Sequence, residues 1–185
     1  MIVNLGTFQI TSGTLVVSDP CYECEQGISG IVEEAAIGTW IGIIDQIDTG
    51  DWGERCAYVC AYHKSIDIEQ VTNWEACDFI VGVDSGQAGI FEHQIYRVDD
   101  SVIGETKFMP EDRWYSSCCD QTLGEPKAGV INGGVVSRSG FGDGGYEAFI
   151  AKNAEGKVIA VQIVFITEED LLEEEEDEED EEDEV

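Results

Sequence analysis

The stretch YEAFIAKNAEGKVIAVQIVFI (residues 146–166) decides the fold class of this chain. Two runs rich in β-branched and aromatic residues flank Asn-Ala-Glu-Gly (153–156), in which Gly156 can take a positive φ. This pattern is typical of two antiparallel strands joined by a hairpin turn. The second run, VIAVQIVFI (158–166), is almost entirely apolar or β-branched, and we expect it to form a central strand.

Similar runs with turn residues between them fill the sequence upstream of this hairpin. We expect strands in TFQIT (7–11), TLVVSDP (14–20), GTWIGIIDQID (38–48), RCAYVCAYH (55–63), DFIVGVDSG (78–86) and AGIFEHQIYRV (88–98).

Helical signals are few and occur at two places in the chain. IEQVTNWEA (68–76) could form a turn or two, and EDRWYSSCC follows Pro110 as a helix start should, with acidic residues in the first turn. The sequence therefore predicts a mainly β protein, with α+β as the alternative. Its architecture would be an antiparallel β-sandwich or barrel-like sheet with one or two short helices and a disordered acidic C-terminal tail.

The length and composition indicate one folded body with a short appendage. The chain has 185 residues, of which 43% are hydrophobic, enough for a sizeable core. We predict a single β-rich domain at 1–166 and an acidic low-complexity tail at 167–185.

The charge limits the partners of this chain. The net charge is −31, and the segment 167–185 alone holds 15 acidic residues and no basic one. Without it, 25 acidic and 9 basic residues leave −16 on the body. Both parts repel phosphate backbones and anionic membrane surfaces, so we expect no nucleic-acid partner and no membrane, whereas a basic protein partner is compatible.

The compartment is predicted from the start of the chain and its cysteines. MIVNLGTFQI has no basic region followed by a long apolar one, and no apolar run has the length of a membrane span. Seven cysteines is an odd number, which argues against a complete disulfide framework. We therefore expect a cytoplasmic protein with reduced thiols.

Three turns rich in polar residues, at 18–22, 84–89 and 140–145, follow predicted strands and are the candidate binding elements. The last of them, Gly140-Phe-Gly142-Asp-Gly-Gly145, fits G-x-G-x-x-G, but a strand-like run follows it instead of the helix that a dinucleotide site needs. The alternative for each turn is a structural one, in which the side chains bond to neighbouring amides. The candidate ligand-binding residues are Asp19, Asp84, Ser85, Gln87, Asp143 and Tyr146.

A catalytic interpretation would use one of few possible nucleophiles. Cys21 or Ser85 would have to recruit His63 or His93, the only two histidines of the chain, as a base. The spacing pairs neither histidine with a particular nucleophile, so catalytic residues stay unknown. Cys21 and Cys24 form a C-x-x-C, but zinc would need two more ligands and no second C-x-x-C exists, so metal and cofactor also stay unknown.

Four stretches of the chain together resemble a group of uncharacterised bacterial and phage proteins. They are VSDPCY (17–22), GVDSGQAGIF (82–91), SGFGDGGYEAF (139–149) and GKVIAVQIVF (156–165), with the turn motifs D-S-G-Q-A-G and G-D-G-x-Y. The resemblance implies a β-rich single domain. It implies no agreed activity, and therefore no catalytic residues.

Three functional hypotheses follow from the sequence. The first is a non-catalytic cytoplasmic binding module that holds a small ligand or a cation in turns gathered at one end of a sheet. The second is a cysteine- or serine-dependent hydrolase or transferase. The third is an acidic phage or bacterial interaction or inhibitor protein that presents its charge to a basic target.

Overall fold

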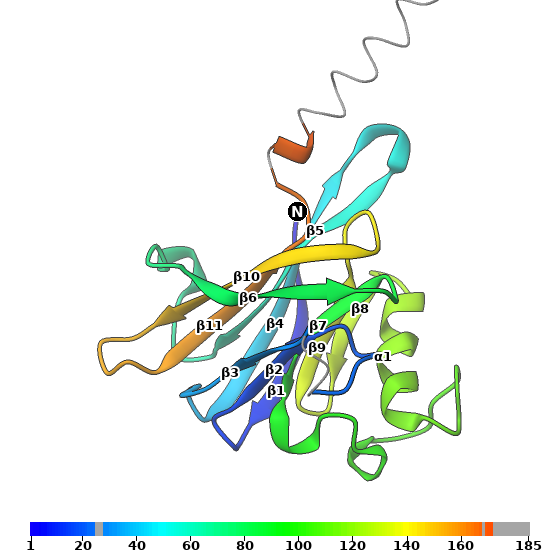
Figure 1. Ribbon diagram of the computed structural model, residues 1–185, viewed down its shortest axis with the longest axis horizontal. Helices are drawn as coiled ribbons and strands as arrows, with labels where there is room; N and C mark the ends of the chain where they lie inside the picture. Colours follow the sequence, from blue (N-terminus) through cyan, green and yellow to red (C-terminus); the bar gives the residue numbers. More distant parts are fainter. Residues whose placement is uncertain (25–27, 168, 172–185) are drawn as a thin grey trace, which may run out of the picture.

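The computed structural model describes residues 1–24, 28–167 and 169–171, and its strands form two antiparallel sheets (Figure 1). This confirms the predicted mainly β fold with few helices. The larger sheet has the order β1 (Ile2–Ile10), β4 (Gly38–Asp48), β5 (Glu54–His63), β11 (Val158–Val164), β10 (Gly144–Lys152) and β6 (Glu75–Val83). The smaller sheet has the order β3 (Gly30–Val32), β2 (Leu15–Ser18), β7 (Gln87–Glu92), β9 (Gly134–Arg138) and β8 (Ala128–Ile131).

The C-terminal hairpin lies where the sequence predicts it. β11 pairs with β10 on one side and with β5 on the other, so the run 158–166 does supply a central strand. Asn153 accepts hydrogen bonds from the amides of Glu155 and Lys157 through its side chain, which closes the turn.

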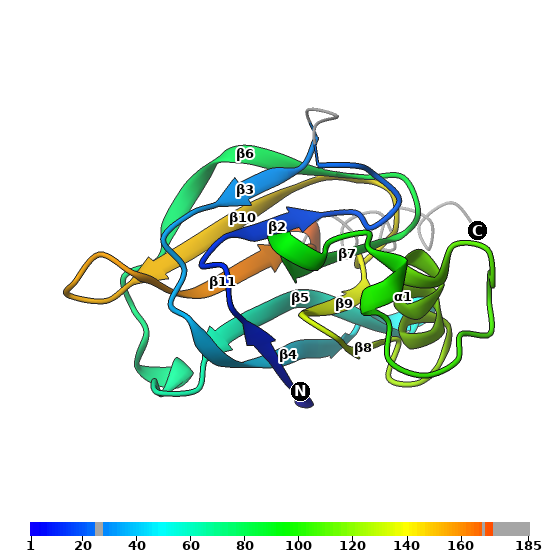
Figure 2. The same cartoon turned by 90° about the horizontal axis from the view of Figure 1, so that it is seen from below.

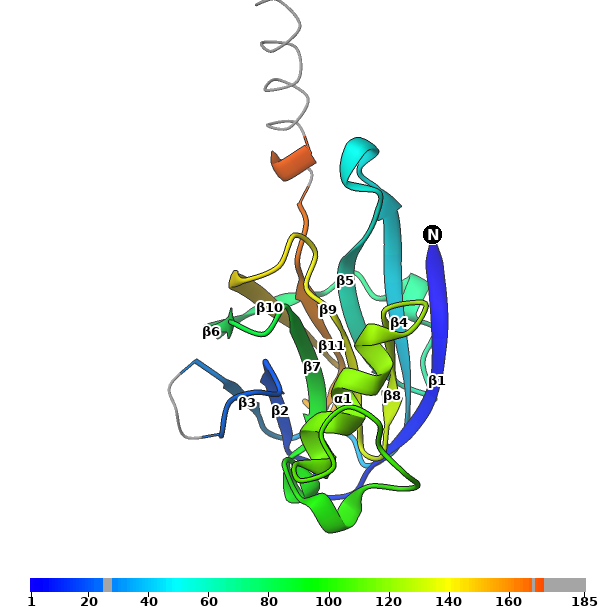
Figure 3. The ribbon, with the colours of Figure 1, turned by 90° about the vertical axis from the view of Figure 1, so that its right-hand side faces the viewer.

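The core lies between the two sheets. Trp40, Ile44 and Val59 come from the larger sheet and are fully buried against residues of the smaller one, such as Leu15 and Ile90. Each such side chain contributes roughly 1.5–3 kcal/mol by leaving water. Figure 3 shows the two layers from the side, with β8 and β9 next to the strands β1, β4 and β5.

The sheets approach each other closely at Gly42 of β4. A Cβ atom there would lie 2.7 Å from the Cγ2 atom of Val135 in β9, closer than side chains tolerate. Any larger residue at this position would therefore push the two layers apart.

The α-helix α1 (Arg113–Leu123) lies beside β8 and β9 (Figure 2). It begins where the side chain of Asp112 accepts a hydrogen bond from the amide of Tyr115 at 3.1 Å, so the N-cap is two residues after Pro110. Trp114 is buried, and its ring lies 5.1 Å from Phe91 and 4.8 Å from Tyr96, which attaches the helix to the smaller sheet.

One sequence prediction of local structure needs correction. The predicted strand 88–98 ends at Glu92, because the Glu92 carboxylate accepts a hydrogen bond from the Gln94 amide and starts the 3₁₀ helix η3 (His93–Ile95). The segment 68–76, predicted to form a turn or two, does form one turn, the 3₁₀ helix η2 (Ile68–Gln70), before β6 begins. Two further 3₁₀ helices are η1 (Gly50–Trp52) and η4 (Asp99–Ser101).

The acidic tail contacts the folded body at Leu171, which packs against the core. Within the tail, the amide of Thr167 donates to the carboxylate of Asp170 at 2.7 Å. The disordered tail was predicted over residues 167–185, of which 168 and 172–185 lie outside the described residues. Within the described part, no helix is long and apolar enough to cross a membrane.

Candidate functional site

Two turns that cross from one sheet to the other lie side by side. Residues 84–86 connect β6 to β7, and residues 139–143 connect β9 to β10. The amide of Gly86 donates to the Asp143 carboxylate at 3.0 Å, and the amide of Ser139 donates to the Gly86 carbonyl at 3.2 Å. Gly86 has a φ of 68°, a conformation that a glycine adopts without strain.

Asp19 holds the first of these turns from inside the protein. Its side chain is fully buried, and one carboxylate oxygen accepts hydrogen bonds from the amides of Asp84 at 2.9 Å and Ser85 at 2.7 Å. The other oxygen accepts from the Ser85 hydroxyl at 2.6 Å and from the Cys21 amide at 2.8 Å. Such a saturated carboxylate fixes the turn rigidly and leaves little capacity for a ligand.

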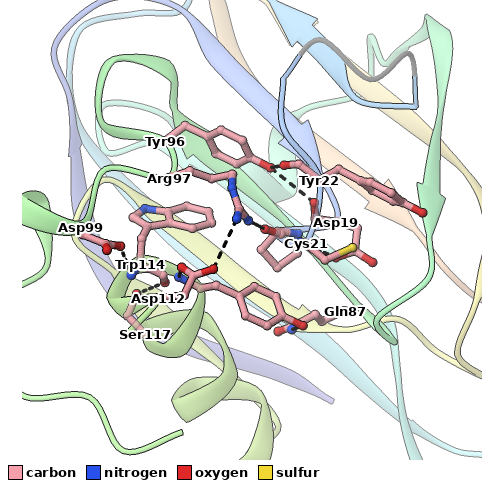
Figure 4. Close-up of polar contacts among 12 residues, drawn as sticks. Asp19, Cys21, Tyr22, Gln87, Tyr96, Arg97, Asp99, Asp112, Trp114 and Ser117 are labelled. Atoms are coloured by element: carbon pink, nitrogen blue, oxygen red, sulfur yellow. Dashed lines mark hydrogen bonds and ion pairs between the residues drawn. The ribbon is translucent and has the colours of Figure 1, made fainter. Parts of the chain in front are cut away.

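The loop that follows Asp19 is attached to the start of α1. Figure 4 shows Arg97 between the carbonyl of Pro20, to which it donates, and the Asp112 carboxylate at 3.3 Å. The hydroxyl of Tyr96 donates to the Tyr22 carbonyl at 2.6 Å. Because Asp112 also caps α1, this network sets the position of the helix relative to the Asp19 loop.

A cavity of about 220 Å³ opens between the 84–86 turn and α1. Its size is below the roughly 300–1,000 Å³ of most small-molecule sites, so it suits a ligand smaller than a typical drug. Phe108 and Leu123 are largely exposed and provide apolar surface. The complete lining consists of Ser85, Gly86, Gln87, Phe108, Tyr115, Cys119, Thr122, Leu123 and Arg138.

One face of α1 supplies the polar wall of this cavity. Tyr115, Cys119 and Thr122 are spaced i, i+4 and i+7, so they lie on the same side of the helix. The side chain of Gln87 meets them, accepting from the Thr122 hydroxyl at 3.0 Å and donating toward the Cys119 sulfur at 3.5 Å. Gln87 thereby joins the start of β7 to the helix.

Arg138 is the only charged residue among those that line the cavity. Its Nε atom donates to the Thr122 carbonyl at 3.2 Å, at the C-terminal end of α1. Within the described residues its two terminal nitrogens have no hydrogen-bonding partner and are available to an anion.

The Cys21 and Cys119 thiols and the Tyr22 hydroxyl stay in their neutral forms. Burial, together with a hydrogen bond to Asp19, raises the pKa of the Cys21 thiol to about 12. The hydrogen bond to Asp84 raises the pKa of the Tyr22 hydroxyl, and burial raises the pKa of Cys119 in the cavity wall. At neutral pH these groups are hydrogen-bond donors and not anions.

The six residues that the sequence predicts fall into two groups. Asp19, Asp84, Ser85 and Asp143 meet at the 84–86 turn, where the Asp84 carboxylate also accepts from the Tyr22 hydroxyl. Gln87, the first residue of β7 after this turn, faces the cavity, which Ser85 also lines.

Tyr146 has a different position. Its hydroxyl donates to the Gly142 carbonyl at 2.7 Å, and its ring lies edge-on to Phe165 at 5.1 Å. It supports the 139–143 turn and is not among the residues that line the cavity.

Among the described residues, no histidine is paired with a candidate nucleophile, as the catalytic alternative would require. His63 contacts Ser65 and Trp40, and His93 starts η3 after Glu92; neither is hydrogen-bonded to Cys21 or Ser85. Six cysteines carry free thiols: Cys21, Cys56, Cys60, Cys77, Cys118 and Cys119. Over the described ranges no group of three or more His, Cys, Asp or Glu side chains is arranged to hold a metal ion.

Sequence reasoning missed most of the cavity wall. Tyr115, Cys119 and Thr122 give a helical spacing that could have been recognised, but only the fold shows that this face meets the 84–86 turn. Arg138 could have been singled out from the sequence by its charge, because the chain has only 9 basic residues against 40 acidic ones.

No protein-family model, no curated protein and no solved structure matches this chain. The resemblance to uncharacterised bacterial and phage proteins therefore stays a prediction.

Proposed function

We propose that this protein is a non-catalytic binding module, which holds a small ligand in the cavity between the 84–86 turn and α1. The observation that carries the proposal is the combination of a turn fixed by buried Asp19 with a cavity whose single charge is Arg138. The turn needs no ligand to be in place, because the protein itself saturates Asp19. Preformed sites of this kind bind without a large ordering cost.

The chemistry of the wall favours an anionic ligand with an apolar part. The Arg138 guanidinium suits a carboxylate or another oxyanion, and Phe108 and Leu123 offer apolar contact. The same charge disfavours a cation, which was the other ligand class compatible with the sequence. The amides around Asp19 also point their hydrogens at its oxygens, which leaves no opening for a metal ion.

The cytoplasm is the location that agrees best with this site. The free Cys119 thiol lies in the cavity wall and the free Cys21 thiol lies beside the Asp19 turn. Reducing conditions preserve both groups. The strong negative charge of the chain supports a small molecule or a basic protein as partner over a nucleic acid.

An NMR titration with phenylacetate tests the proposal. We expect the amide signals of Ser85, Gly86 and Gln87 to move, and Arg138→Gln to weaken binding about tenfold or more through the loss of a charge-assisted contact. The neutral analogue phenylacetamide should bind more weakly than phenylacetate to the unaltered protein.

Lys64→Gln is the matched control, because Lys64 is exposed and does not line the cavity. Binding of phenylacetate to this variant should be unchanged. Equal binding of the two compounds, or the absence of movement at these amides, would contradict the proposed anion site.

A further inference from the structure

Three of the nine basic residues line one narrow groove between the two sheets. Arg55 comes from β5, Lys127 directly precedes β8, and Arg138 ends β9. We call this surface the cationic groove. Its remaining lining residues are Gln46, Glu54, Cys56, Pro126 and Gly140, so a single carboxylate faces three cations.

The three cations are not neutralised by the described part of the protein. The ion pairs found there are made by the N-terminus, Arg97, Lys152 and Lys157, and none involves the cationic groove. The arrangement is unfavourable in itself, since Lys127 and Arg138 are neighbours across the β8–β9 ladder, where the Arg138 amide donates to the Lys127 carbonyl. An anion from outside the groove would stabilise this cluster, either a separate molecule or one of the chain's 40 acidic residues from a segment distant in the sequence.

Arg55 adds an independent sign that the groove lacks a partner. Its Nε atom is buried and has no hydrogen-bond acceptor, the only side-chain atom in the described residues with this property. The space in the groove amounts to about 10 Å³, room for one oxygen atom but not for a whole anion. The groove therefore fits single carboxylate oxygens that reach in from a segment lying along its mouth.

The acidic tail leaves the folded body beside this groove. A Cβ atom on Gly140, which lines the groove, would lie 2.9 Å from Phe165 and 3.0 Å from Ile166. The amides of Phe165 and Ile166 both donate to the Ala57 carbonyl of β5, two residues after Arg55. Figures 1 and 3 both show the orange end of the described chain near the connection between β9 and β10.

The tail has the charge and the reach to fill the groove. Residues 173–184 are 12 consecutive acidic residues. At roughly 3.3 Å per residue, even a few of them extend from the body far enough to bend back to the groove. Because the tail is tethered next to the groove, its effective concentration there is high, on the order of millimolar.

We propose that the cationic groove is the docking surface of the chain's own acidic tail, whose carboxylates neutralise Arg55, Lys127 and Arg138. This inference does not depend on the ligand proposed for the neighbouring cavity. If both are correct, the tail and an anionic ligand compete for Arg138, which lines the groove and the cavity alike.

The arginine Nε–H signals in an NMR spectrum of the full-length protein test this proposal. The chain has only four arginines, and Arg113, which donates to the carbonyls of Val102 and Gly104, serves as the internal reference outside the groove. We compare about 0.02 M salt with about 0.5 M salt, which screens exposed charges over a few Å. The Arg55 and Arg138 signals should move between the two conditions, and the Arg113 signal should not.

A neutral tail provides the decisive variant and leaves the body unchanged. In this full-length variant, Gln and Asn replace the acidic residues 173–184. Its Arg55 and Arg138 signals should stay at their high-salt positions under both conditions. The same low-salt positions with the native and the neutral tail would overturn the proposal.

Lys127→Gln tests the surface itself. Loss of one cation should lower the docking equilibrium constant about fivefold, so the Arg55 signal should reach its high-salt position at a lower salt concentration. Lys64→Gln removes one positive charge outside the groove and should leave this midpoint unchanged. An equal shift in both variants would show that only net charge matters, and it would overturn the specific docking surface.

Discussion

Asp19 and Glu92 are buried carboxylates at opposite ends of the same pair of strands, β2 and β7. Asp19 follows β2 where Ser18 pairs with Gly89, and Glu92 ends β7 opposite Leu15. Glu92 accepts hydrogen bonds from the amides of Thr11, Ser12 and Gln94, much as Asp19 does from its own neighbours.

The surroundings of the two carboxylates differ. Glu92 fixes the connection between β1 and β2 and the start of η3. Asp19 fixes a turn between the sheets, and that turn borders a cavity with Arg138 in its wall. Both buried carboxylates are therefore structural anchors. Only the Asp19 turn lies next to a cavity with a cation that is unpaired among the described residues, the Arg138 guanidinium, and this distinguishes it as the candidate site.

The largest expected effect follows from Asp19→Ala. The substitution leaves the amides of Cys21, Asp84 and Ser85 without their acceptor inside the protein, and we expect it to lower the free energy of unfolding by about 4 kcal/mol. Urea unfolding measures the loss. A loss below about 1 kcal/mol would show that Asp19 does not anchor the turn.

Glu92→Gln should cost about 2–3 kcal/mol at neutral pH, because the new amide group faces amide donors. Burial alone would raise the pKa of Glu92, but the hydrogen bonds from Ser12, Thr11 and Gln94 outweigh it, so the pKa lies below 4.5. The unfolded chain then takes up the proton first as the pH falls.

The contribution of Glu92 is therefore present above about pH 4.5 and is lost as the pH falls through the lowered pKa of the folded protein. Unfolding of both proteins across this range measures the difference. The stability gap between the native protein and Glu92→Gln should narrow toward pH 3, and a gap that is constant with pH would contradict this origin.

Thiol labelling tests the surroundings of Asp19, because the Cys21 thiol lies beside it. With a pKa of about 12, Cys21 should react with iodoacetamide at pH 7.5 about a hundredfold more slowly than an unperturbed thiol. Mass spectrometry of labelled peptides gives the rate at each cysteine. Rapid stoichiometric labelling of Cys21 alone would instead favour the cysteine-dependent enzyme.

The smallest effect is expected for the double substitution Asp84→Ala with Asp143→Ala. The Asp143 bond to the Gly86 amide and the Tyr22 bond to Asp84 are both exposed, so the melting temperature should change by no more than about 3 °C. Thermal unfolding followed by circular dichroism checks it. Collapse of the fold would show that these carboxylates are anchors like Asp19.

The fold class could be predicted from the sequence because strands produce local patterns of apolar and polar residues. The run 38–48 alternates as a strand with one covered face does, and the observed β4 spans the same residues. The end of β7 was not predictable in this way, since it depends on the Glu92 carboxylate meeting donors from Thr11 and Ser12, 80 or more residues away.

The candidate site was predictable only in part. The polar turns around Asp19 and Asp84 stand out in the sequence, and the fold does bring them together. Which of them faces a cavity depends on the packing of α1, and burial decides that Asp19 is an anchor. Neither property follows from residue type or spacing.

Hydrogen exchange at the Ser85 amide tests most directly whether Asp19 preforms the site. Ser85 lies in a turn, yet its amide donates to a buried carboxylate at 2.7 Å. We predict exchange at least about a thousandfold slower than in an exposed loop, which corresponds to an opening free energy of about 4 kcal/mol. Exchange at the rate of an exposed loop would contradict a turn that is held in place without a ligand.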